Sequence, residues 1–103
     1  MRQEKKKYLS SYLLQETKIN RIRNMSVVNP ELKAKYDEEL KEVLDLRLKI
    51  EKQIAKVDGG ILSELLCQKY IFGKTLEDIS LVLNYSTRHI ERLHIKALDK
   101  FEM

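Results

Sequence analysis

The spacing of apolar residues between Leu76 and Leu93 restricts the fold of this chain more than any other feature. Two short helices that cross at a steep angle need apolar side chains where they touch. Counted from Leu76, the fourth, eighth, tenth, fifteenth and eighteenth positions are Ile79, Leu83, Tyr85, Ile90 and Leu93. The spacing therefore predicts a helix, a tight turn and a second helix.

Smaller residues in the same stretch fit this arrangement. Ser80 stands at the fifth position, where two such helices come closest and a small side chain is needed. Asn84 stands at the ninth position, where the chain turns, and Asn is the residue after Gly that best tolerates a left-handed conformation. Thr75 resembles the start of a capping box, with Asp78 in place of Glu or Gln. Ser86 is expected to cap a last helix that runs to about Lys100.

The composition favours an all-α fold. Charged residues make up 35% of the chain, which has one Pro and three Gly, so few residues break helices. The single Cys67 cannot form an intrachain disulfide, and its apolar surroundings indicate a packing role. No apolar run is long enough for a membrane span or a secretory signal, so we expect a cytoplasmic protein without membrane contact.

Two long helices are expected first. Apolar residues in 3–25 recur at the period of an amphipathic helix, with Tyr8 and Tyr12 expected in the core. Asn29 and Pro30 then give a helix-start signal. The next helix, 30–57, carries a near-regular heptad with Arg47 as its one polar position. At 1.5 Å per residue it spans roughly 42 Å, so it needs a partner helix from the same chain or a second copy.

The segment Asp58-Gly59-Gly60 is the clearest boundary in the sequence. It divides the chain into an arm (residues 1–58) and a head (residues 59–103). A third helix is expected over 61–71. Its inward residues should be Leu62, Leu65, Leu66 and Tyr70. The expected architecture is a long two-helix, coiled-coil-like arm followed by a three-helix head.

The positive charge is concentrated in the first part of the chain, and the head is not basic overall. Residues 1–29 carry seven Lys or Arg against two Glu, whereas residues 58–103 carry six basic and seven acidic residues. On a helical wheel, the last helix buries Ile90, Leu93, Ala97 and Phe101. Its opposite face presents Arg88, Glu91, Arg92, Ile95 and Asp99. The stripe of cations is formed by Arg88, Arg92, Lys96 and Lys100.

Such a stripe, on the second helix of a helix-turn-helix, indicates binding to double-stranded DNA. A helix in the major groove reads bases with its first turns and touches the backbone with later ones. Arg88 and Arg92 are therefore expected to donate to guanine, and Glu91 to accept from cytosine. Ile95 would meet a thymine methyl group or a protein partner. The expected phosphate contacts are Thr87, His89, Lys96 and Lys100.

Other interpretations of these residues are weaker or stay open. A basic stripe alone is usually a solvated face, and only the helix-turn-helix spacing favours DNA binding. His89 and His94 are five residues apart and do not form a metal site; His94 is expected to pack half-buried beside the apolar seam. Lys5, Lys6 and Lys7 are a solvated terminus or a loose phosphate contact. No catalytic or cofactor motif is present, so we expect no enzyme and no cofactor.

The stretch from Leu62 to Phe101, about 40 of the 103 residues, resembles region 4 of bacterial sigma-70-type factors. The matching segments are Tyr70–Ile79, Leu83–Ser86 and Ile90–Phe101, with Asn84 in place of the usual Gly. A helical N-terminus joined to such a head is similar to small phage and prophage regulators of the ArpU and RinA type. The resemblance implies control of phage late or packaging genes. It places DNA contacts on Ser86, Thr87, Arg88, His89, Glu91 and Arg92.

The expected function is thus a sequence-specific transcription regulator that inserts helix 86–100 into a major groove, with a homodimer through the N-terminal helices as a further possibility. One alternative is the DNA-recognition and oligomerisation subunit of a phage packaging machine, similar to a small terminase. Another is a sigma-like module that binds RNA polymerase and hardly touches DNA.

Overall fold

The computed structural model describes all 103 residues, and every regular element in it is helical, as the composition predicts. The elements are α1 (Arg2–Val28), the 3₁₀ turn η1 (Pro30–Leu32), α2 (Lys33–Ala55), α3 (Gly60–Leu66), the π-helical segment η2 (Cys67–Ile71), α4 (Leu76–Leu83) and α5 (Thr87–Lys100). None of the helices combines the length and the apolar composition that a membrane-spanning segment needs.

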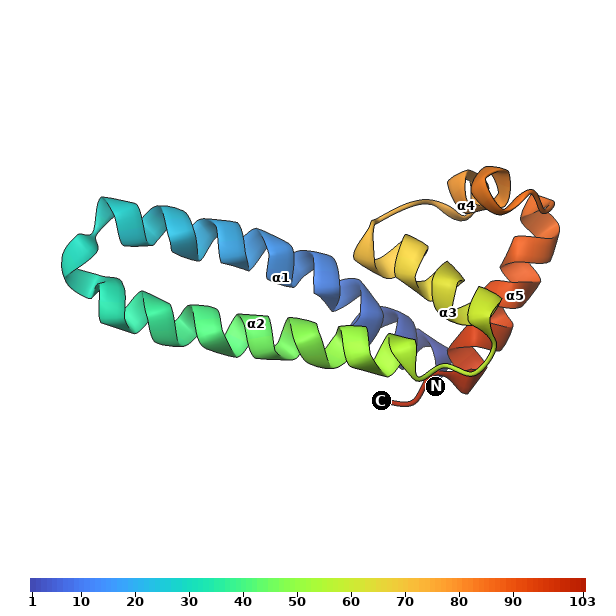
Figure 1. Cartoon of the computed structure of the whole chain (residues 1–103), viewed down its shortest axis with the longest axis horizontal. Coiled ribbons are helices and arrows are strands. Elements are labelled where there is room, and N and C mark those ends of the chain that lie inside the picture. Colours follow the sequence, from blue (N-terminus) through green and yellow to red (C-terminus); the bar gives the residue numbers. More distant parts are fainter.

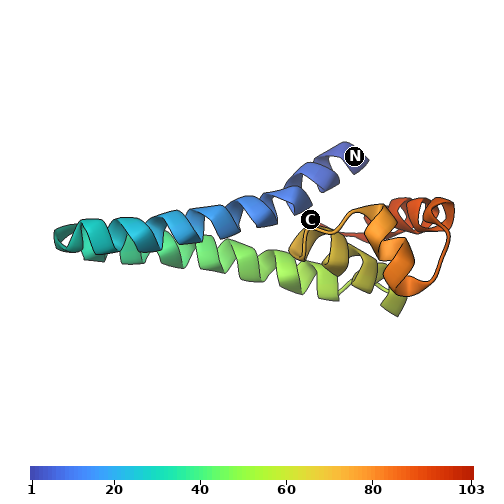
Figure 2. The ribbon, with the colours of Figure 1, turned by 90° about the horizontal axis from the view of Figure 1, so that it is seen from above.

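Helices α1 and α2 form a long antiparallel hairpin, and the remaining elements gather at one end of it (Figures 1 and 2). The molecule measures 52 × 25 × 21 Å, and its radius of gyration is 16.2 Å. A compact chain of this length would have a radius of about 13 Å. Because α1 packs along α2, the partner that the long second helix needs is α1 of the same chain.

The tip of the hairpin differs from the expected boundary. Helix α1 continues to Val28, past the predicted end at 25, because nothing stops it before proline. Asn29, which precedes Pro30, leaves the helical region at φ −125° and ψ 73°. Its side chain makes no capping hydrogen bond, and Pro30 opens the turn η1 before α2 begins at Lys33.

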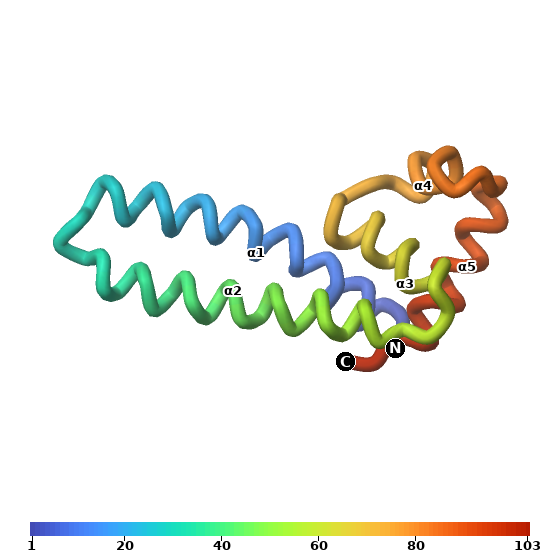
Figure 3. The backbone as a smooth tube through the Cα atoms, in the orientation of Figure 1, coloured from blue at the N-terminus to red at the C-terminus, as the bar shows by residue number.

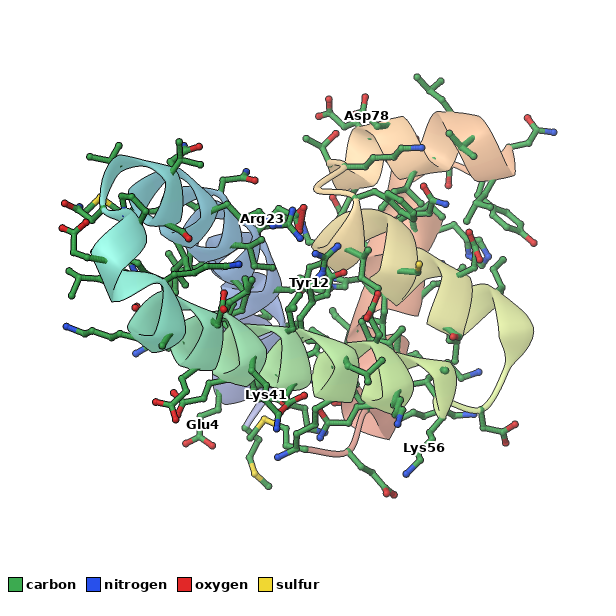
Figure 4. All side chains as sticks on the ribbon, turned by 60° about the vertical axis from the view of Figure 1, so that its left-hand side comes forward. Glu4, Tyr12, Arg23, Lys41, Lys56 and Asp78 are labelled. Atoms are coloured by element: carbon green, nitrogen blue, oxygen red, sulfur yellow. The ribbon has the colours of Figure 1, made fainter.

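The heptad of α2 packs against a partner helix as predicted, and the partner is α1 of the same chain. The buried heptad residues are Tyr36, Val43, Ile50, Ile54 and Val57, and Leu40 is partly buried. Arg47 donates through Nε to the hydroxyl of Tyr12 at 2.7 Å and lies 3.0 Å from a carboxylate oxygen of Glu16. Tyr12, labelled in Figure 4, is buried and donates to Glu51 at 3.1 Å. Arg47 is tolerated there because it gives the buried phenol a partner.

The base of the arm and the head share one core. The largest buried cluster joins Leu9, Tyr12, Ile50, Ile54 and Val57 of the arm to Leu62, Leu66, Tyr70, Ala97, Leu98 and Phe101 of the head. Five of these six head residues were predicted to face inward, and Leu98 is the exception. The boundary at Gly59 is a sharp turn with φ +94°, but the packing is continuous across it.

Polar contacts fasten the start of α1 to the end of α5, and the tube in Figure 3 shows these two ends at the same corner. The guanidinium of Arg2 binds both carboxylate oxygens of Asp99, at 2.8 and 3.0 Å. The ammonium of Lys5 donates to the carbonyl oxygen of Leu98 at 2.8 Å. A cation at this position is favourable because the last carbonyl oxygens of a helix carry partial negative charge. Lys5 is therefore engaged in holding the fold together.

Candidate nucleic-acid interface

Helix α4 begins and ends at the residues that the sequence indicates. The hydroxyl of Thr75 accepts a hydrogen bond from the backbone N–H of Asp78 at 3.1 Å. Asn84 adopts the left-handed conformation, with φ 60° and ψ 42°, and is the only residue other than Gly with a positive φ. The N–H of Tyr85 then donates to the carbonyl of Ser80 at 3.0 Å, which closes the helix end.

Helices α4 and α5 meet at the small residue that the spacing requires. Ser80 is only 5% exposed, and its hydroxyl lies 3.3 Å from that of Thr87. Beside this contact, Ile79 and Ile90 are fully buried with Leu65 of α3. Leu83 and Leu93, two further predicted contact residues, pack against the same cluster and are partly buried.

The prediction for Tyr85 is wrong. It was expected to pack between the two helices, but it is 42% exposed, and its ring lies against His89 with the ring centres 4.9 Å apart. The hydroxyls of Ser80 and Thr87 bring the helices close together, so no space remains between them for an aromatic ring. The turn at Asn84 instead places Tyr85 on the outside, beside the start of α5.

The first two predicted contact residues of α5 have partners within the protein. Ser86 caps the helix, because its hydroxyl accepts a hydrogen bond from the backbone N–H of His89 at 3.1 Å. Thr87 is partly buried and bonds Ser80. The Ser86 hydroxyl therefore stabilises the start of α5, and the Thr87 hydroxyl links α5 to α4.

Replacing Ser86 by alanine is expected to lower the free energy of unfolding by about 1 kcal/mol, because the cap is lost. Ser86→Asp keeps an acceptor at the cap and should retain most of the stability. Urea unfolding of the three proteins measures the difference. A Ser86→Ala protein as stable as the wild type would show that this hydroxyl does not cap the helix in solution.

The outward face of α5 is open to solvent. Its exposed residues are Arg88, His89, Glu91, Arg92, Ile95, Lys96 and Lys100, all of them predicted site residues. None of the four cations in this set lies within 4.0 Å of a carboxylate oxygen. Their charges are thus available to an external anion, and Arg88 and Arg92 stand in the first turns of the helix.

At the C-terminal end of this face, a residue of the arm pairs with a residue of α5. Asp99 is paired with Arg2, and this hydrogen bond lowers the pKa of the Asp99 carboxyl group. The charge of Arg2 therefore compensates the negative charge of Asp99 next to Lys100. The arm packs on the inner side and the C-terminal end of α5, and the outward cations before Asp99 stay uncovered.

The buried side of α5 is broader than the predicted seam. Ile90, Ala97 and Phe101 are buried and Leu93 is partly buried, as expected, but Leu98 is fully buried as well. Ile90, His94 and Leu98 follow one another at four-residue steps and so lie on one face of the helix. This spacing could have revealed the burial of Leu98, but the histidine in the middle of the row hides the pattern.

His94 is more deeply buried than the half-buried packing residue that the sequence predicts. It is 5% exposed, and its Nε2 lies 2.7 Å from the hydroxyl oxygen of Tyr70. Burial, with the nearby Lys69 and Lys6, lowers the pKa of His94 to about 4. Burial also raises the pKa of Tyr70 to about 12. Both side chains are therefore neutral at pH 7 and fix the inner side of α5 to η2.

The exposed face of α5, its capped start and its paired end together form a rigid, cation-bearing surface. Comparisons with models of protein families, with curated proteins and with solved structures find no match for this chain.

Proposed function

We propose that this protein is a sequence-specific transcription regulator that binds double-stranded DNA by placing α5 in a major groove. The observation that carries the proposal is the open outward face of α5, whose cations have no acidic partner in the chain. The caps at Thr75 and Ser86 support it, since they fix where α4 and α5 begin, and the Ser80–Thr87 contact joins the two helices, as a helix-turn-helix requires.

Within this proposal, the exposed residues take different roles. Arg88 and Arg92 donate to guanine, and Glu91 between them accepts from cytosine. Lys96 and Lys100 lie further along the helix and contact phosphates. Ser86 and Thr87 act by positioning the helix, because their hydroxyls already have partners.

The resemblance to sigma-70 region 4 and to regulators of the ArpU and RinA type extends the proposal to control of phage or prophage late genes. A dimer formed through the arms would place two heads on half-sites about 34 Å apart or a multiple of that distance. RNA polymerase is the further partner that the resemblance implies.

Selection of bound duplexes from a random pool tests the proposal. We expect one short motif to be enriched, with guanine at the positions read by the arginines, and an affinity that falls steeply with salt. Enrichment of no motif, with equal affinity for all duplexes, would contradict sequence-specific recognition. The mass of the free protein, measured under the same conditions, gives the number of copies that associate before DNA binds.

Lys96→Ala is expected to weaken binding to the selected duplex and to a scrambled duplex by a similar factor. A phosphate contact carries no sequence information, and losing one should reduce the salt slope by about one. Anisotropy titrations over a range of salt concentrations measure both effects. Lys33→Ala, which removes an exposed lysine at the start of α2, is the matched control. A change in sequence preference would assign Lys96 to base reading.

A second candidate is the recognition and oligomerisation subunit of a phage packaging machine. Leu44 and Leu48 are four residues apart on one face of α2, and both remain exposed, which favours association along the arm. A ring of eight or more copies in solution would support this function, and a monomer or dimer would support the regulator.

A sigma-like module that binds polymerase is the third candidate. Leu81 and Val82 are 81% and 60% exposed on the outer side of α4, where apolar side chains suit a protein partner. Co-purification with polymerase, together with salt-insensitive behaviour on DNA, would favour this candidate over the regulator.

A further inference from the structure

A cavity of about 500 Å³ lies between the arm and the inner side of the head. Its polar lining residues are Lys6, Ser10, Lys69, Lys74, Thr75 and His94. They come from α1, η2, the segment before α4 and the buried side of α5. The volume is in the range of pockets that hold small molecules.

The charge of this lining is of one sign. Lys6, Lys69 and Lys74 are each partly buried, and no carboxylate lines the cavity. Their ammonium groups make no ion pair and no hydrogen bond within the chain. The acids nearest in sequence to Lys74, Glu77 and Asp78, are exposed on α4, and Asp78 is labelled at the outer edge of the head in Figure 4.

Three ammonium groups without a carboxylate partner around one space repel each other, because partial burial reduces the screening by water. The positive charge also acts on His94, because Lys69 and Lys6 add to the effect of burial in lowering its pKa. Ser10 and Thr75 also line the cavity, and their hydroxyl groups can donate hydrogen bonds. The lining therefore offers many donors to an anion and no acidic group that would reject it.

We propose that this cavity binds the phosphate group of a small phosphorylated molecule, with Lys6, Lys69 and Lys74 as its cationic contacts. Bound phosphate would relieve the repulsion between the three lysines and link the arm to the head. A small molecule fits better than a DNA backbone, because the cavity is bounded by the side of α5 that carries His94. That side lies opposite Arg92, two residues earlier on the helix.

The site can be tested without DNA, so its failure is independent of the proposed function. The probe is pyrophosphate, titrated at constant ionic strength and followed by the amide signals of Gly73 and Leu76 and the ring signals of His94. We expect saturable shifts in these groups. We also expect the His94 pKa to rise with bound pyrophosphate, because the anion offsets the charge of Lys69 and Lys6.

Lys69→Gln/Lys74→Gln should weaken pyrophosphate binding by at least about tenfold, since two charge-assisted contacts are lost. Lys33→Gln/Lys35→Gln removes the same charge from an exposed part of the arm and should bind as the wild type. Thermal melting checks that each variant is folded. If the Lys69→Gln/Lys74→Gln variant is not folded, Lys6→Gln, which removes the cavity lysine of α1, takes its place.

Equal pyrophosphate binding by both double variants would overturn the proposal, because it would show that binding depends on the net charge of the protein and not on the cavity. Shifts that do not saturate, or that appear equally at the arm tip, would overturn it as well. If a short duplex, but not pyrophosphate, protects the three lysines from acetylation, they belong to a DNA surface and the small-molecule site is excluded.

Discussion

Arg88→Ala/Arg92→Ala should lose about 2–6 kcal/mol of binding free energy for the preferred duplex, because each arginine–guanine pair contributes about 1–3 kcal/mol. The variant should also lose most of its preference over a scrambled duplex. Both side chains are exposed and have no ionic partner in the chain, so the fold should be unchanged. Anisotropy titrations with both duplexes at one fixed salt concentration measure the two effects.

The matched control is Arg23→Ala/Lys33→Ala, which removes two exposed cations from the arm. It should weaken binding slightly and to the same extent for both duplexes, because only the net charge changes. If the two double variants bind alike, the free cations of α5 do not read bases and the groove assignment is wrong.

Acid is expected to destabilise the fold by about 3 kcal/mol between pH 7 and pH 4 through His94 alone. The folded protein holds the pKa of His94 at about 4, whereas the ordinary value is 6.5. Between these values the unfolded chain binds a proton that the folded chain does not. Stability from this residue is therefore complete above pH 6.5, falls as the pH drops, and levels off below pH 4.

Urea unfolding at several pH values, in wild type and His94→Gln, isolates this effect. Glutamine stays neutral and can still bond the hydroxyl of Tyr70, so the variant should show a flatter pH profile. His89→Gln removes the only other histidine, which is exposed, and should keep the wild-type slope. A His94→Gln profile parallel to that of the wild type would mean that His94 is protonated normally in the folded protein.

The parts of the head that depend on neighbouring residues were predictable from sequence. Thr75, Asn84 and Ser86 act through hydrogen bonds or backbone conformations within a few residues of themselves, and all three adopt the expected roles. The same holds for the heptad of α2, because a regular four- and three-residue step defines one face wherever the partner comes from.

Contacts between distant segments were not predictable. The pair Arg2–Asp99 joins residues 97 positions apart, and no local pattern indicates it. Tyr85 was misassigned because the spacing rule describes which positions are apolar, and not how much room the Ser80–Thr87 contact leaves. The π-helical segment at Cys67–Ile71 adds one residue to a turn, which a helical wheel with a fixed step does not reveal.

The attachment of α1 to the end of α5 decides where this protein can be labelled. A dye or affinity handle at either terminus would crowd the corner where Arg2 and Lys5 fasten the last helix. The hairpin tip, where Val27 and Val28 are already exposed, lies at the opposite end of the molecule. An immobilised or fluorescent form built there would leave α5 and the lysine-lined cavity untouched.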